Sequence, residues 1–122
     1  MDATGCEPSE LDAAEQRLGL RLPNPLRTLL GIGDGRYDTA GQWWIVWPLE
    51  QLVEDNEKNW REGWVDRSLV AFGDDGAGDP FCMYLDGSSD TIVRWSMTER
   101  EVFEEYPTLS DFAVTWLAPE GA

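Results

Sequence analysis

The sequence has no histidine, one lysine and two cysteines among its 122 residues. Histidine is the commonest acid–base and metal-ligating side chain, so its absence removes the usual catalytic pairs and most zinc sites. Serines such as Ser68 and Ser96 have no imidazole to activate them as nucleophiles. We therefore expect a protein that is not an enzyme.

The two cysteines match neither a metal-ligand spacing nor a redox spacing. Cys6 lies in a segment that we expect to be frayed, and Cys82 lies in an apolar run where a strand side chain would pack. A disulfide between them is the alternative, but we interpret both as free thiols. No metal and no other cofactor is expected.

Long apolar runs are also missing. No stretch approaches the roughly 18 apolar residues of a membrane span, and the first residues show no basic segment followed by an apolar run. We therefore expect a cytoplasmic protein without a membrane partner. Because neither repeats nor a Pro/Ser-rich linker divide the chain, residues 1–122 are expected to form a single domain.

What the chain has in excess is negative charge: 24 acidic against 9 basic residues give a net charge of −15. Such a field repels phosphate backbones, so nucleic acid is not an expected partner, and it speeds encounter with a basic protein surface. The alternative is that acidity only keeps the protein soluble or reflects a salt-adapted proteome. All cations except Lys58 are arginines, a bias that we associate with a GC-rich bacterial genome.

Hydrophobic residues make up 42% of the chain, which places it among folded proteins and not among disordered ones. Ser9 with Asp12 resembles a capping box, Asn24 is predicted to be an N-cap before Pro25 at the first helical position, and Thr108 with Asp111 opens a last helix. The patterns predict helices over 10–18, 25–30, 49–61 and from 108 onward, and strands over 42–47, 69–72, 80–85 and 91–95.

The strand predicted over 42–47 is aromatic and β-branched, and it is apolar on both faces, which is typical of a central strand. The strands predicted after residue 68 follow one another through short turns, which favours an antiparallel meander. The expected fold class is α+β, with a mainly antiparallel sheet of about four or more strands flanked by about four helices.

The densest acidic cluster is Asp74, Asp75 and Asp79 in the glycine-rich loop over 73–80. A calcium loop needs a closing glutamate and an oxygen ligand where Ala77 stands, so no metal site is predicted here. The glycines do not form a phosphate-binding pattern either. The loop is then either a turn between two strands or part of a partner interface, and both alternatives stay open.

The tryptophans also allow two interpretations. Because side chains alternate along a strand, Trp44 points away from Trp43 and Trp47. Either helices cover both faces of this strand, or one face is an exposed aromatic patch that binds a partner. Trp60 and Trp64, four residues apart, are similarly divided between a lid on the core and a binding anchor.

Several segments, in this order, resemble the SUKH superfamily (Smi/Knr type) from about residue 9 to residue 117. They are EQRLGLRLP at 15–23, LRTLL at 26–30, a Gly-Asp-Gly turn, PLEQL at 48–52 leading to Asn56, and AFGDDGAGD at 71–79. The chain departs from the family in its short lead and in Asn24-Pro25-Leu26, where an acidic residue and an aromatic are common. The resemblance implies an α+β binding module without a shared catalytic site.

Many bacterial proteins of this family resemble immunity proteins that neutralise toxins, often nucleases, and fungal relatives act as interaction hubs. The resemblance and the charge together favour an immunity protein whose partner is a cognate toxin with a basic surface. A regulatory scaffold and a small-ligand sensor are the alternatives. The residues predicted to bind the protein partner are Glu50, Glu54, Asp55, Glu57, Trp44, Trp64, Asp74, Asp75 and Asp79.

Overall fold

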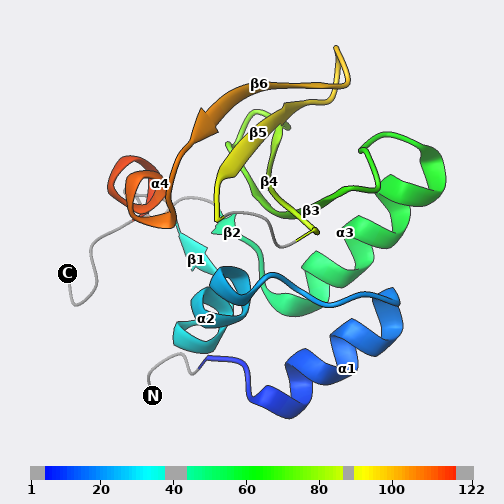
Figure 1. Cartoon of the computed structure of the whole chain (residues 1–122), viewed down its shortest axis with the longest axis vertical. Helices are drawn as coiled ribbons and strands as arrows, with labels where there is room; N and C mark the ends of the chain where they lie inside the picture. Colours follow the sequence, from blue (N-terminus) through cyan, green and yellow to red (C-terminus); the bar gives the residue numbers. More distant parts are fainter. Residues whose placement is uncertain (1–4, 38–43, 87–89, 118–122) are drawn as a thin grey trace.

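The computed structural model describes residues 5–37, 44–86 and 90–117. Two helices come first, a third precedes the main sheet, and a fourth follows it (Figure 1). The helices are α1 (Pro8–Leu18), α2 (Asn24–Ile32), α3 (Leu49–Glu62) and α4 (Leu109–Trp116). The strands are β1 (Arg36–Tyr37), β2 (Trp44–Val46), β3 (Leu69–Asp74), β4 (Pro80–Tyr84), β5 (Ile92–Ser96) and β6 (Glu101–Tyr106). The predicted α+β class is confirmed.

The main sheet contains β3, β4, β5 and β6 in the order of the chain, with each neighbouring pair antiparallel. The predicted meander is therefore confirmed, but its last strand, β6, was missed. This strand reads EVFEEY and alternates between exposed and half-buried residues. Glutamate is poor in strands, so the sequence pattern is weak, and an edge position tolerates the charge.

The prediction of a central strand over 42–47 is wrong. β2 pairs with the short strand β1 in a separate two-stranded sheet, and residues 41–43 lie outside the described residues. The segment is nevertheless deeply buried, because Ile45 and Val46 have no exposed surface. The Trp47 backbone N–H donates to the Phe72 carbonyl at 2.8 Å, so the end of β2 lies against β3. Strand β2 is therefore buried because it packs against the main sheet, although it is not one of the strands of that sheet.

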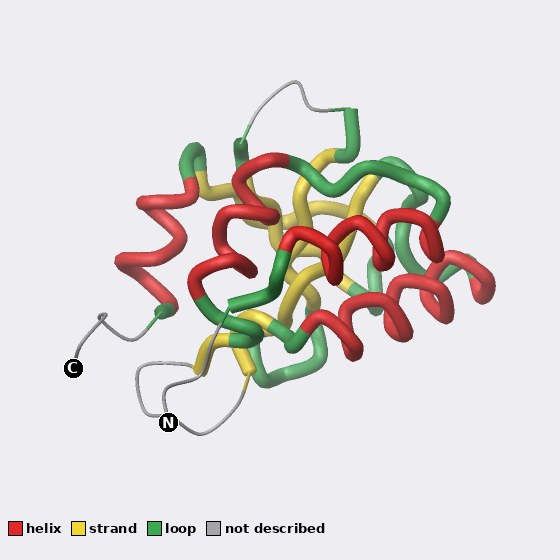
Figure 2. The backbone as a smooth tube through the Cα atoms, turned by 90° about the horizontal axis from the view of Figure 1, so that it is seen from below, coloured by secondary structure: helices red, strands yellow, loops and turns green. Residues whose placement is uncertain are grey.

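Helix α3 packs against β3 and α1 lies beside α3, whereas α4 lies at the far end beside β6 (Figure 1). In Figure 2, seen from below, α1, α2 and α3 stand in front of the strands and α4 stands to one side, near the C-terminus. The apolar faces of α1 and α3 contribute Leu11, Ala14, Leu52, Val53 and Trp60 to one continuous core. Burying these faces is what holds the helices on the sheet.

Helix α4 is held by an aromatic cluster. Phe112 is fully buried, and its ring lies 5.5 Å from that of Phe72 and 4.8 Å from that of Phe81, in edge-to-face geometry. The Trp116 ring lies 5.0 Å from that of Phe81 on the other side. Such pairs add about 1 kcal/mol each beyond the area that they bury. The cluster therefore fixes α4 to β3 and β4.

The first turns of the helices show one confirmed prediction and two wrong ones. Asn24 is the first residue of α2 and not its N-cap, a position that Pro23 occupies. The Thr108 hydroxyl accepts a hydrogen bond from the Asp111 backbone N–H at 3.1 Å, so Thr108 caps α4 as predicted. Helix α1 begins earlier than expected, at Pro8, and its capping box uses Glu7 and Glu10 in place of the predicted serine and aspartate. Proline suits the first helical position because that position needs no N–H donor.

Asn56 connects α3 to the outer edge of β3. Its side chain is fully buried, and its amide nitrogen donates to the carbonyls of Leu52 at 2.8 Å and Ala71 at 2.6 Å. Its amide oxygen accepts from the Ala71 backbone N–H at 2.9 Å. One side chain thus satisfies both backbone groups of Ala71, which an edge strand would otherwise leave without partners.

Gly73 is required by a close approach of two backbones. A Cβ atom at this position would lie 1.6 Å from the Ile45 carbonyl oxygen, far inside contact distance. The register of β3 against β4 also shifts between Ala71 and Gly73, so the strand bends here. This bend brings the turn over residues 74–79 toward the end of β2.

Candidate functional site

The turn between β3 and β4 is organised by its own aspartates. The Asp75 side chain is 5% exposed, and its Oδ1 accepts hydrogen bonds from the backbone N–H groups of Ala77 at 2.8 Å and Asp79 at 3.2 Å. Its Oδ2 accepts from the Arg94 guanidinium at 2.9 Å. Because the pair is largely removed from water, the Asp75 charge depends on Arg94, which also forms an ion pair with Glu104 at 3.0 Å.

The other two aspartates connect this turn to neighbouring segments. Asp74 Oδ2 accepts from the Trp47 indole N–H at 2.9 Å, and Asp79 Oδ1 accepts from the Met97 backbone N–H at 3.0 Å. The three predicted binding residues of this loop therefore hold the turn and its surroundings together. Of the two interpretations left open by the sequence, the geometry supports the structural one, and contact with a partner stays a prediction.

The four predicted binding residues of α3 divide into two pairs. Glu57 accepts two hydrogen bonds from Arg17, at 2.8 and 3.0 Å, and this bonding lowers the pKa of the Glu57 carboxyl. Asp55 is half-buried and accepts from the Gln51 amide at 3.3 Å. Glu50 and Glu54 are exposed, and their carboxylates form no hydrogen bond or ion pair with any described residue. These two can pair with a partner without breaking an internal contact.

Trp64 is half-buried in the turn that follows α3. The Trp64 carbonyl accepts from the Trp95 indole N–H at 3.0 Å, and the Lys58 ammonium lies 5.6 Å from the centre of the Trp64 ring. Part of the ring stays available to a partner, as an anchor requires. Trp44 lies in β2, but its side chain is outside the described part of the structure, so its predicted role stays a prediction.

A second group of acidic residues, which the sequence analysis did not single out, lies on the β5–β6 hairpin. Glu99, Glu101 and Glu105 are exposed, and within the described residues their carboxylates have no hydrogen-bonding or ionic partner. Only the high density of glutamates over 99–105 could have indicated this group. The hairpin turn itself is held against α3, because Arg100 donates to the Gly63 carbonyl at 3.4 Å.

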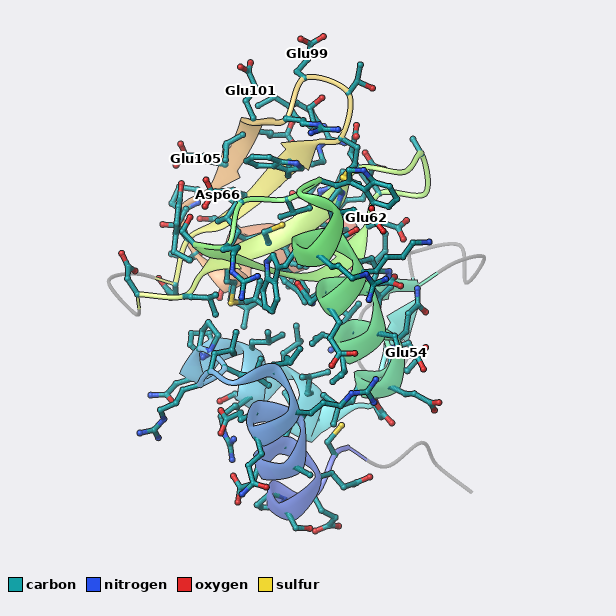
Figure 3. All side chains as sticks on the ribbon, turned by 90° about the vertical axis from the view of Figure 1, so that its right-hand side faces the viewer. Glu54, Glu62, Asp66, Glu99, Glu101 and Glu105 are labelled. Atoms are coloured by element: carbon teal, nitrogen blue, oxygen red, sulfur yellow. The ribbon has the colours of Figure 1, made fainter. Side chains whose placement is uncertain are left out.

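Figure 3 shows how acidic residues from α3, from the turn after it and from the hairpin spread over one side of the molecule. Asp66 accepts hydrogen bonds from the hydroxyl and backbone N–H of Ser68, which lower the pKa of its carboxyl. We call this surface the acidic face, and it consists of Glu54, Glu62, Asp66, Glu99, Glu101 and Glu105. Carboxylates spread over one side in this way suit attraction of a positively charged surface.

Neither cysteine has the surroundings of a nucleophile. Both are free and buried, and burial raises the pKa of each thiol, to about 12 for Cys6. The expectation that the segment around Cys6 is frayed is wrong, because its backbone N–H donates to the Leu30 carbonyl at 2.8 Å. A thiol with a raised pKa contains little thiolate at neutral pH, and the thiolate is the reactive form.

In residues 5–37, 44–86 and 90–117, no three His, Cys, Asp or Glu side chains gather in an arrangement that could hold a metal ion. Within the same ranges, none of the helices combines the length and the apolar character needed to cross a membrane.

The family model described as SMI1 / KNR4 family (SUKH-1) matches residues 5–114, which include α1, α2, α3 and all of α4 except its last two residues. No curated protein matches the chain.

Proposed function

Because the chain belongs to the SMI1 / KNR4 (SUKH-1) family, we propose that it is an immunity protein that neutralises a cognate toxin by binding to a basic surface of that toxin. The family supports an interaction module as the general role. The observation that carries the finer proposal is the acidic face, on which Glu54, Glu99, Glu101 and Glu105 have no internal partner among the described residues.

Unpaired carboxylates on one face act first on the rate of encounter. A net charge of −15 produces a field that draws a basic partner toward the protein, and charges on the rim orient it. At physiological salt the field decays over about 8 Å, so the residues nearest the contact dominate. Glu99 and Glu101 lie at the projecting hairpin, which supports their proposed role as the charges nearest the toxin.

Once the partner is in contact, apolar burial holds the complex. Trp64 follows α3, accepts a hydrogen bond from the Trp95 indole of β5 and lies two residues from both Glu62 and Asp66, so the proposed anchor has acidic residues close to it. Large aromatic side chains often supply most of the binding energy at such a centre, while the charged rim excludes water. The proposal needs no catalytic group in this protein, since blocking a toxin requires occupancy alone.

The experiment begins with the partner. Tagged protein is used to capture partners from its native lysate, and a recovered basic toxin is then purified and its association rate measured by stopped flow over a series of salt concentrations. We expect Glu101→Lys to slow association about fivefold at low salt, with the effect fading as salt rises.

Asp90→Lys is the matched control, because it makes the same charge reversal at the opposite end of β5. Equal slowing by both variants would mean that net charge acts without a particular face. Recovery of regulatory proteins, with no toxin and no protection of cells that express one, would replace the immunity role by that of a scaffold.

The anchor is tested separately with Trp64→Ala. We expect it to weaken the complex by about 2 kcal/mol, or roughly thirtyfold in Kd, mainly through faster dissociation. Trp64→Phe keeps a large aromatic ring and should retain most of the affinity. If Trp64→Ala folds normally and binds the toxin as well as the unmodified protein does, the interface lies elsewhere.

A further inference from the structure

A basic groove is the least expected feature of this acidic protein. It is an open depression of about 550 Å³ between the C-terminal ends of α1 and α3 and the segment after α3. Three of the nine cations of the chain line it. We call it the arginine groove, and its lining residues are Arg17, Leu18, Glu57, Trp60, Arg61 and Arg67.

A favourable interaction with a helix dipole explains only two of the three arginines of the groove. Arg17 and Arg61 lie in the last turns of α1 and α3, where a cation favours the helix dipole. Arg67 lies beyond both helices, so no dipole accounts for it. Its guanidinium instead lies 5.5 Å from the centre of the Trp60 ring.

Two of the three guanidinium groups, those of Arg61 and Arg67, form no strong ion pair. With 24 acidic residues in the chain, an arginine has many potential partners, yet Arg67 forms no ion pair with any residue that the structure describes. Arg61 forms one long ion pair, in which its Nε lies 3.8 Å from a carboxylate oxygen of Glu62, and its charge also contributes to the lowered pKa of Glu57. Both groups can therefore take a bound anion without losing a strong internal bond.

Arg17 is held in a fixed position at the opposite wall. Its Nε and one Nη donate to the two carboxylate oxygens of Glu57, at 3.0 and 2.8 Å. A guanidinium has five N–H donors, so this pairing leaves donors on its outer edge. An oriented guanidinium fork matches an oxyanion with less loss of freedom than a mobile ammonium group would.

The size and lining of the groove indicate the class of ligand. The volume is in the range of small-molecule sites, but three guanidinium groups suit a compact, doubly charged anion better than an apolar compound. A phosphate group carries nearly two negative charges at neutral pH and three acceptor oxygens, enough to contact arginines from different elements. Long nucleic acids are opposed by the acidic surroundings, whereas a small anion meets mainly the local charge.

We propose that the arginine groove binds a small phosphate-bearing molecule through Arg17, Arg61 and Arg67. Binding there needs no second protein, and the three arginines that carry it are not among the residues predicted to bind the toxin, although Glu57 in the groove is one of those residues. A dicarboxylate offers similar charge, so the test includes one.

The experiment titrates ¹⁵N-labelled protein with sodium phosphate at pH 7, with total ionic strength held constant by sodium chloride. We expect saturable NMR shifts that are confined to the Trp60 indole and to backbone amides near residues 17 and 60–68. Malonate replaces phosphate in a second titration. Tighter binding of phosphate supports the proposal, and equal or tighter binding of malonate overturns the phosphate assignment.

Arg67→Gln removes the unpaired guanidinium and should weaken phosphate binding about tenfold, which is the effect of losing about 1.4 kcal/mol. Arg21→Gln is the matched control, since Arg21 is exposed and lies outside the groove. Arg67→Lys keeps the positive charge but loses the forked guanidinium group, so its affinity for phosphate should lie between those of Arg67→Gln and Arg21→Gln. Linear, unsaturable shifts, or equal weakening by Arg21→Gln and Arg67→Gln, would overturn the proposal.

Discussion

Two acidic turns of the same sheet have different roles. The turn between β3 and β4 carries Asp74, Asp75 and Asp79, and every one of these carboxylates accepts a hydrogen bond from within the protein. The turn between β5 and β6 carries Glu99 and Glu101, whose carboxylates have no such partner among the described residues. Acidic residues thus stabilise the fold at the β3–β4 turn, whereas at the β5–β6 turn their carboxylates stay available to a binding partner.

Side-chain length accounts for much of this difference. An aspartate carboxylate is near enough to its own backbone to accept from N–H groups two residues ahead, as Asp74 and Asp75 do with Gly76 and Ala77. A glutamate carries its carboxylate one carbon farther out, where water solvates it. The difference between the β3–β4 turn and the β5–β6 turn therefore depends more on whether the acidic residues are aspartates or glutamates than on how many there are.

The largest effect is expected from Asp75→Ala. The substitution removes the acceptor of two backbone N–H groups and leaves Arg94, whose side chain is 18% exposed, with a weaker set of partners. We expect the free energy of unfolding to fall by about 3 kcal/mol. Urea denaturation measures it. Asp75→Asn, which keeps an acceptor oxygen, should lose about half as much, and a loss below ~1 kcal/mol for Asp75→Ala would contradict the structural role.

A smaller effect is expected from Asp79→Ala, which removes the contact between the two turns. The Met97 backbone N–H loses its acceptor, at a cost of about 1 kcal/mol. Hydrogen exchange should show faster exchange at Met97, while amides within α1 keep their rates. Uniform acceleration over the whole protein would mean that the contact acts globally and not at the turn.

The smallest effect on stability is expected from Glu99→Gln combined with Glu101→Gln. Both side chains are exposed and without internal partners, so the free energy of unfolding should change by less than about 0.5 kcal/mol. The sign should be stabilising at low salt, because the protein carries −15 charges that repel one another, and should vanish at high salt. A clear destabilisation would mean that these carboxylates have a structural role as well.

The elements that were predicted correctly have strong local signals. Helix α3 was expected over 49–61 and spans Leu49–Glu62, because apolar residues recur there at helical spacing. The start of α4 was found through the Thr108 cap. Strand β6 was missed because its glutamates give it the polar composition of a solvated loop. Strand β2 was assigned to the wrong sheet because a buried apolar run does not indicate which sheet contains it.

The candidate site was harder to predict than the fold. The glycine-rich loop was correctly interpreted as a turn that permits two roles, but the groups that bond its aspartates, such as Trp47, Arg94 and Met97, lie far away in the sequence. Burial and hydrogen bonding between segments that are distant in the sequence depend on the tertiary structure, so local sequence patterns do not predict them. The accessible glutamates at 99–105 were overlooked for the related reason that their hairpin was not recognised.

The Asn56 amide has a consequence for misfolding. An open sheet can grow by adding a strand from another molecule at either edge. At β3, Asn56 occupies both backbone groups of Ala71, and Trp47 occupies the Phe72 carbonyl, so self-association is blocked at this edge while α3 stays docked. At β6, the exposed charges of Glu101 and Glu105 repel a second copy. Aggregation should therefore begin with detachment of α3, which removes the Asn56 side chain from the backbone groups of Ala71 at this edge.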